Sequence, residues 1–98
     1  MIYVGTDLKF AITIQCEGFD MLQDNFRIEL KNGKRKLVIE KKDIVYDDDE
    51  DTWYLCFCSS DLGPGNITMV VYAEVPDVDF AGERTEVYKC TLCHIENV

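Results

Sequence analysis

The stretch from Asp61 to Val87, DLGPGNITMVVYAEVPDVDFAGERTEV, limits the possible folds of this chain more than any other segment. A Gly-Pro-Gly turn at 63–65 precedes ten residues, 66–75, that are rich in β-branched and aromatic side chains and therefore have strand composition. Pro76 follows, and because proline has no N–H to donate to a neighbouring strand, we expect it to end this strand. The polar link DVDFAGER then leads into another long strand. This order of strand, turn and strand predicts an antiparallel β-domain.

Apolar side chains alternate with polar side chains along most of the remaining chain, which is the period expected of strands with one buried face. No helical pattern extends beyond the single turn that we expect at Met21–Asp24. The Asn32-Gly33 pair predicts a two-residue hairpin turn of type I′, because both residues tolerate a positive φ. The strands are expected near residues 8–16, 26–31, 34–40, 43–46, 52–58, 66–75 and 85–95.

Strands of this number and spacing predict an all-β fold, a two-sheet immunoglobulin-like β-sandwich of six or seven antiparallel strands. A chain of 98 residues is long enough for one modest core, so we expect a single domain over residues 1–98. A small β-barrel is the alternative architecture. An antibody-type domain is not expected, because Trp53 lies far beyond Cys16 in the sequence instead of a short way after it.

The formal net charge of −9 is divided unevenly between the two halves of the chain. Residues 1–46 contain seven acidic and eight basic side chains, whereas residues 47–98 contain twelve acidic and two basic ones. Such an acidic chain is unsuited to nucleic acid, whose phosphates require many lysines and arginines. No apolar run reaches the roughly 18 residues of a membrane span, and the first ten residues lack signal-peptide features. We therefore expect neither nucleic acid nor a membrane as a partner.

Two charged clusters are the candidate partner-binding residues. The basic tip lies beside the predicted hairpin turn, and the acidic loop lies between two predicted strands. Complementary charged patches orient protein partners and speed their encounter, so we expect the basic tip of one copy to contact the acidic loop, or another acidic surface, of a neighbour. The acidic loop lacks the alternating spacing and the glycine of a calcium loop, which favours a solvated hairpin end. Within the basic segment Lys31–Lys36, the basic tip consists of Lys34, Arg35 and Lys36, and the acidic loop consists of Asp47, Asp48, Asp49, Glu50 and Asp51.

The five cysteines are odd in number, which speaks against a disulfide framework, and we expect reduced thiols that are mostly buried as small hydrophobic side chains. The CTLCH segment at 90–94 matches the C-x-x-C-H pattern of haem attachment, but within a strand its two thiols would point to opposite faces. We therefore expect no metal and no cofactor. The alternative is a small zinc-binding protein whose ligands are Cys56, Cys58, Cys90 and Cys93, with His94 nearby.

Motifs for catalysis are absent from the sequence. There is no nucleophile elbow, phosphate-binding loop or metalloprotease motif, and His94 is the single histidine, so we expect no enzymatic activity. A carbohydrate-binding or adhesive module is a further alternative, in which Trp53 and the five tyrosines would form a platform for a sugar. Trp53 alternates with Leu55 and Phe57, however, and this pattern predicts that its ring is buried in the core.

Several segments, taken in order, carry a family resemblance. They are an early YVGTDLKFAITI strand, an F-x-I-x-L-K-N-G hairpin, a WYLCF strand, and the run LGPGNITMVVYAEVPDVDFAGERTEV. From Tyr3 to about Leu92 the chain resembles a module of small virion proteins from tailed bacteriophages and prophages of Bacteroides-type hosts. It is similar to the immunoglobulin-like N-terminal domain of phage upper-baseplate proteins. The cysteine-rich details are outside this pattern.

The resemblance implies a structural role without catalysis. The chain would be a virion structural or adaptor protein of a tailed phage, located in the head, the head–tail junction, the tail or the baseplate. It would be present in multiple copies and would bind other virion proteins. It would be made in the cytoplasm of the bacterial host, where thiols remain reduced.

Overall fold

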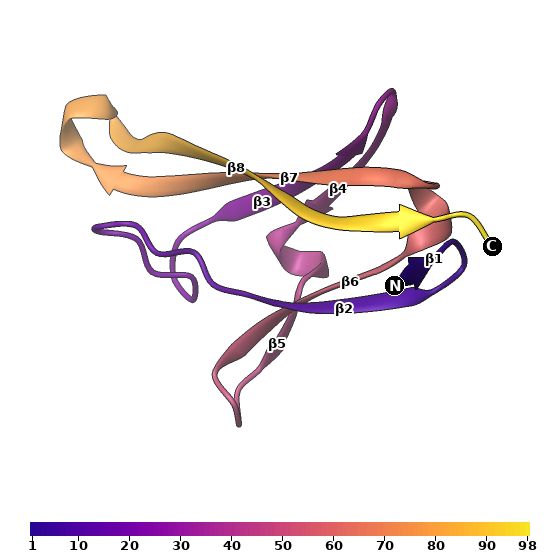
Figure 1. Cartoon of the computed structure of the whole chain (residues 1–98). Coiled ribbons are helices and arrows are strands. Elements are labelled where there is room, and N and C mark those ends of the chain that lie inside the picture. Colours follow the sequence, from indigo (N-terminus) through magenta and orange to yellow (C-terminus); the bar gives the residue numbers. More distant parts are fainter.

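The computed structural model describes residues 1–98, and its longest element is a hairpin formed by β7 (Gly65–Asp77) and β8 (Gly82–Glu96). The larger of two sheets is built around this hairpin, with the strand order β1-β8-β7-β3-β4 (Figure 1). β3 (Phe26–Asn32) and β4 (Arg35–Glu40) are antiparallel neighbours, whereas β1 (Ile2–Tyr3) runs parallel to the end of β8.

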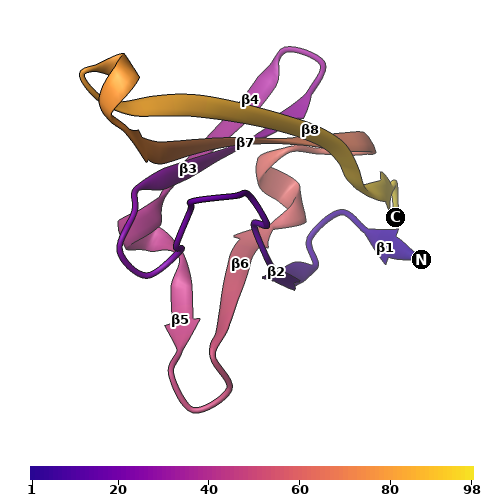
Figure 2. The same ribbon diagram turned by 90° about the vertical axis from the view of Figure 1, so that its left-hand side faces the viewer.

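The smaller sheet has three antiparallel strands in the order β2-β6-β5 and lies across one face of the larger sheet (Figure 2). Its strands are β2 (Asp7–Ile12), β5 (Val45–Asp47) and β6 (Thr52–Cys58). Short 3₁₀ helices connect the two sheets or close a hairpin: η1 (Lys41–Asp43), η2 (Ser59–Asp61) and η3 (Val78–Phe80). None of these helices is long and apolar enough to cross a membrane.

Both sheets contribute every second side chain to one shared core. Phe26, Ile28 and Leu30 point inward from β3, and Trp53, Leu55 and Phe57 point inward from β6. The rings of Phe26 and Trp53 meet edge to face across the two sheets, with 5.5 Å between their centroids. The alternation seen in the sequence therefore identified the buried faces of these strands correctly.

The prediction of an all-β chain with two sheets is confirmed, but three details are wrong. The larger sheet is mixed, because β1 joins it in parallel. There are eight strands instead of six or seven, since β1 and β5 have only two and three residues and give almost no periodic signal. The first predicted strand, 8–16, ends at Ile12. The alternative of a small barrel is also wrong, because the chain forms two separate sheets.

Pro76 does not end its strand, contrary to the prediction, because β7 continues to Asp77 and Pro76 pairs with Glu83. The N–H of Glu74 donates to the carbonyl of Asn25 at 2.9 Å, so it points away from β8. Backbone groups two residues apart point the same way, and the nitrogen of Pro76 therefore also points away from β8. β3 begins at Phe26, opposite Ala73, so no strand lies on that side to require an N–H from Pro76.

The turn between β3 and β4 lies one residue later than predicted. Gly33 and Lys34 form it, and of these two only Gly33 has a positive φ, 58°. The type I′ prediction is therefore wrong, since that turn requires a positive φ at both central residues. Asn32 belongs to β3 and pairs with Arg35. The single turn expected at Met21–Asp24 is present, with the Asp24 N–H donating to the Asp20 carbonyl at 2.8 Å.

Candidate docking surfaces

The basic tip lies at the outer end of the β3–β4 hairpin, and its three residues are exposed. Lys34 is in the turn, and Arg35 and Lys36 begin β4. Lys36 forms an ion pair with Glu29 at 3.6 Å, and Lys31 reaches the same carboxylate oxygen at 3.6 Å. Glu29 is one of only two buried polar or charged residues, so Lys36 has a structural partner. Lys34 and Arg35 are consequently the two tip residues whose charge is free for another molecule.

A side-chain amide holds the hairpin end in place. Nδ2 of Asn32 donates to the carbonyl oxygens of Leu62 at 2.9 Å and Pro64 at 2.8 Å, which attaches the hairpin to the Gly-Pro-Gly turn. A Cβ on Gly65 would lie 2.9 Å from Oδ1 of Asn32, and the φ of Gly65 is +127°. Only glycine allows this close approach, so Gly65 both forms the turn and lets Asn32 hold the hairpin that carries the basic tip.

The acidic loop closes the β5–β6 hairpin, and part of its charge is used inside the loop. Oδ1 of Asp47 accepts the backbone N–H of Asp49 at 3.0 Å, in an Asx turn. Asp51 and Glu50 accept hydroxyl hydrogen bonds from Tyr46 and Tyr54, at 2.6 and 3.2 Å. The side chains of Asp48 and Asp49 are exposed and make no such contacts.

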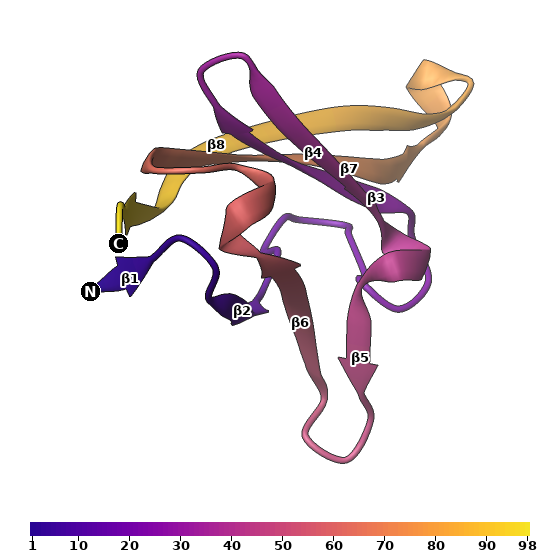
Figure 3. The same cartoon turned by 90° about the vertical axis from the view of Figure 1, so that its right-hand side faces the viewer.

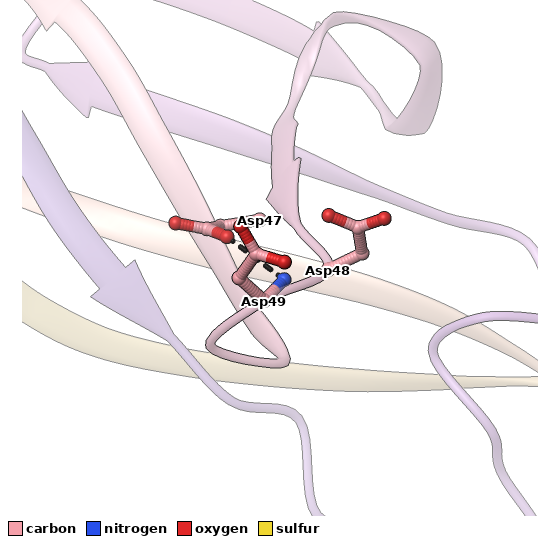
Figure 4. A group of neighbouring side chains, drawn as sticks. All are labelled: Asp47, Asp48 and Asp49. Carbon is pink, nitrogen blue, oxygen red and sulfur yellow. Dashed lines mark hydrogen bonds between the residues drawn. The ribbon is translucent and has the colours of Figure 1, made fainter.

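Asp47, Asp48 and Asp49 are the one group of three or more potential metal ligands with ligand atoms within 4.8 Å of one another (Figure 4). Two of the three are exposed, and acidic groups of this kind are common at solvated hairpin ends. The cluster therefore provides a local concentration of negative charge without the enclosing oxygen ligands of a calcium loop.

The two charged clusters lie on opposite sides of the molecule. The β3–β4 hairpin and the β5–β6 hairpin point away from each other in both Figure 1 and Figure 3. The basic tip thus has no access to the acidic loop of its own chain. A contact between these two clusters requires a second molecule.

The pKa of the Tyr46 phenol depends on the acidic loop, because its hydroxyl donates to Asp51. Its hydrogen bond to Asp51, together with partial burial, raises the pKa of Tyr46 to about 12. This bond stabilises the fold below the normal tyrosine pKa of about 10 and is lost as the pH rises through 12.

We predict that Asp51→Asn lowers the pKa of Tyr46, because the carboxylate that favours the protonated phenol is removed. Asparagine tolerates the positive φ of Asp51, 51°, so the loop should keep its shape. The check is a pH titration of ¹³C-labelled tyrosine by NMR, and an unchanged Tyr46 curve would contradict the assignment.

The cysteines are free, as expected, but none of the five is buried, so the prediction of mostly buried thiols is wrong. Cys56 and Cys58 lie on the outer face of β6, opposite the face of Leu55 and Phe57. Cys90 and Cys93 lie on β8, which belongs to the other sheet. The four proposed zinc ligands are therefore not brought together in this structure.

A β-bulge changes the geometry of the CTLCH segment. Ile67 pairs with Cys93 and Thr68 with Thr91, so Leu92 is an extra residue in β8. As a result Cys90 and Cys93, three positions apart, share one face of the sheet, and the expectation of opposite faces is wrong. His94 is held by Asn66, whose Oδ1 lies 2.7 Å from Nδ1, and by Glu96, 3.1 Å from Nε2. His94 and Asn66 therefore already have side-chain partners at the sheet surface.

Trp53 is 9% exposed, and its ring packs against Phe26 and against Tyr46, 4.7 Å away between centroids. The prediction that this ring belongs to the core is confirmed. A sugar platform built on Trp53 would need the face of the indole, which these neighbours cover.

A third surface was missed in the sequence. The hairpin of β7 and β8 extends beyond β3, and its end, the arm tip, consists of residues 76–83 (Figure 1). Val78 is 91% exposed and Phe80 60% exposed, between the acidic residues Asp77, Asp79 and Glu83. The link DVDFAGER looks polar by composition, but the turn of η3 leaves its two large apolar side chains, Val78 and Phe80, in solvent. Exposed apolar side chains at a projecting end are typical of a contact surface.

A polar cluster attaches the loop after β2 to the inner face of β8. The thiol of Cys16 donates to Glu86, which raises the pKa of Cys16, and the same bond is the largest cause of the lowered pKa of Glu86. The hydroxyl of Tyr88 also donates to Glu86, at 2.6 Å, and Arg84 reaches Glu86 at 3.4 Å. This cluster supports the inner face of β8.

No protein-family model matches the chain, and no curated protein or solved structure does so either. The resemblance to phage virion proteins therefore depends on the sequence segments named above.

Proposed function

We propose that this protein is a non-enzymatic structural or adaptor protein of a tailed-phage virion, which acts by docking to other virion proteins and to further copies of itself. The observation that carries the proposal is the placement of the basic tip and the acidic loop at opposite ends of one β-domain. The exposed Val78 and Phe80 of the arm tip give it a further contact surface. The sequence resemblance supplies the virion setting, with synthesis in the bacterial cytoplasm.

The strand order supports an immunoglobulin-like arrangement for this domain. With β2 taken as strand B, the sheets correspond to B-E-D and to C′-C-F-G, the grouping of the immunoglobulin fold. Phe26 on β3 and Trp53 on β6 then fill the space between the sheets that antibody domains fill with a disulfide and a tryptophan. This packing suits a domain that has no disulfide bond.

Opposed charges at two ends favour a head-to-tail contact. Such a contact is heterologous, because different surfaces of the two copies meet, and it generates a ring or an open filament. Exposed charges of this type set orientation and association rate, and salt screens them over about 8–10 Å at physiological ionic strength. The contact should therefore be strongest at low ionic strength.

We predict that Lys34→Glu combined with Arg35→Glu abolishes salt-sensitive self-association, because the two free charges of the basic tip are reversed. Lys36 is left unchanged, since its reversal would place a carboxylate beside Glu29 and affect folding. Sedimentation velocity across a salt series measures the effect, and thermal unfolding confirms that the fold is intact. Lys42→Glu, an exposed lysine outside the tip, is the control and should associate like the wild type.

A charge exchange sharpens this test. Asp48→Lys combined with Asp49→Lys should also prevent salt-sensitive association, because both free carboxylates of the acidic loop are reversed. Neither reversed protein should show salt-sensitive association alone. In the first double variant the free charges of both clusters are negative, and in the second they are positive, so an equal mixture should restore salt-sensitive association between the two variants. A mixture without salt-sensitive association would rule out the head-to-tail contact.

The virion setting requires a separate experiment. Quantitative mass spectrometry of purified phage particles should find the protein at a constant ratio to the major capsid protein. The unpackaged fraction should not rise when particles are washed. Absence from the particles, with the protein remaining in the lysed cells, would refute the virion setting while leaving the docking surfaces to be tested on their own.

A further inference from the structure

β8 has an open edge over most of its length. It pairs with β7 along one side, but on the other side β1 contacts only Ile95 and Glu96. The segment from Glu83 to Thr91 therefore has a neighbouring strand on one side alone. The opposite edge of this sheet, β4, has six residues and begins with two positive charges, features that discourage pairing.

The register shows which backbone groups of β8 point outward. Because the N–H of Glu74 points away from β8, the groups of Ala73 and Val75 point toward it. Their partners in the ladder are Glu86 and Arg84, so the even-numbered residues of this part of β8 bond to β7. The odd-numbered residues present unpaired N–H and C=O groups to solvent. These are Glu83, Thr85, Val87, Lys89 and Thr91.

This edge carries the charged side chains of Glu83, Arg84, Glu86 and Lys89, but two other usual protections are missing. Between Glu83 and Thr91 there is no proline and no bulge, and the extra residue Leu92 follows only at the end of the segment. Val87 is 56% exposed and Tyr88 41% exposed. A further strand can therefore pair along this segment up to the point where the bulge and β1 begin.

We propose that two copies of the chain pair antiparallel through these β8 edges, with Val87 facing Val87 of the second copy, to form a twofold dimer with one continuous sheet. A twofold axis through the sheet keeps the inner faces of both copies on the same side, so each residue lies opposite one of its own parity. Centring on Glu86 or Lys89 would place like charges opposite each other. Centring on Val87 packs the exposed valines together and places Glu86 opposite Tyr88 of the second copy. In this register the outward groups of Thr85 and Lys89 also meet, and each such pair exchanges two N–H···O bonds.

The structure has room for the second strand. A groove of about 230 Å³ lies on the inner side of the edge, between residues 88–90 of β8 and residues 13–15 of the loop after β2. In the proposed register the second strand ends at Gly82, opposite Leu92, so it stops before it reaches β1 at Ile95.

The test compares Val87→Pro with Val87→Thr by sedimentation equilibrium in about 0.5 M NaCl, where contacts between exposed charges are screened. Proline removes an N–H that the monomer does not use, and its ring blocks an incoming strand, so the dimer dissociation constant should rise at least about tenfold. Threonine keeps both the N–H and the β-branched shape, and Val87→Thr should dimerise like the wild type. A wild-type protein that remains monomeric, or a dimer that Val87→Pro does not weaken, would overturn the proposal.

A cross-linking experiment tests the register without depending on the folding of the proline variant. Val87→Cys should form a disulfide between copies under mild oxidation, because residues facing each other in a ladder have Cα atoms within disulfide range. Lys89→Cys is the matched control, and it should not link to itself. Cys90 should not link to itself either, since the two Cys90 residues would lie about 20 Å apart along the strands. Peptide mapping that finds links through residue 90 in place of 87 would overturn the register. These results are independent of the head-to-tail contact, which the same salt concentration suppresses.

Discussion

Phe26→Ala should destabilise the fold by about 3–5 kcal/mol, a large part of the total stability of a domain of this size. Phe26 is 1% exposed, and its ring contacts Trp53 on β6 and Phe19 in the loop after β2. Removing the ring leaves a cavity at the point where the two sheets and this loop meet. β3 and β6, which carry the two rings, each lie between two other strands and relax only in part, so the cavity remains costly.

Urea unfolding followed by the fluorescence of Trp53 measures this loss. Val38→Ala is the matched control, because Val38 belongs to the same sheet but is 43% exposed, and its truncation should change stability by at most about 0.5 kcal/mol. A loss below about 1 kcal/mol for Phe26→Ala would mean that the two sheets do not share the core described here.

Local patterns in the sequence predicted the main features of the fold. Leu55 and Phe57 were expected inside because they alternate with Cys56 and Cys58, and the same alternation implied that these cysteines lie outside. The expectation of buried thiols gave weight to the average behaviour of cysteine over this pattern, and it failed for that reason. Pro76 was misjudged because its effect depends on whether a strand lies on its nitrogen side, which only the extent of β3 determines.

The contacts that position the candidate surfaces were not predictable from local patterns. The amide of Asn32 bonds to carbonyls 30 and 32 residues away, and the carboxylate of Glu29 pairs across strands with Lys36. The extra residue Leu92 has no signature in the sequence, although it determines which face Cys93 occupies. The basic tip and the acidic loop were predicted as clusters, whereas their placement at opposite ends required the arrangement of the two sheets.

Ser59→Ala should destabilise the fold by about 2–3 kcal/mol, although it removes a single oxygen atom. Ser59 is completely buried, and its hydroxyl oxygen accepts the backbone N–H groups of Gly5 and Thr6, both at 2.9 Å. The same hydroxyl donates to the carbonyl of Tyr3 at 3.0 Å. Alanine would leave three backbone groups without this partner in a partly buried site, and each unsatisfied group costs roughly 1–3 kcal/mol before water and relaxation compensate.

The Ser59 hydroxyl also holds β1 beside the end of β8, where the open edge of β8 stops. It fastens the turn after β1, and β1 covers the end of β8 through Ile95 and Glu96 and through the Val4 N–H, which donates to the Glu96 carbonyl at 2.9 Å. Hydrogen exchange of the Val4 amide should accelerate in Ser59→Ala much more than exchange within β7, because β1 detaches while the central hairpin persists. Ser60→Ala is the matched control, since its exposed hydroxyl contacts only the Cys58 sulfur, at 3.0 Å. Equal stability and equal exchange in the two variants would show that Ser59 does not hold the N-terminal strand in place.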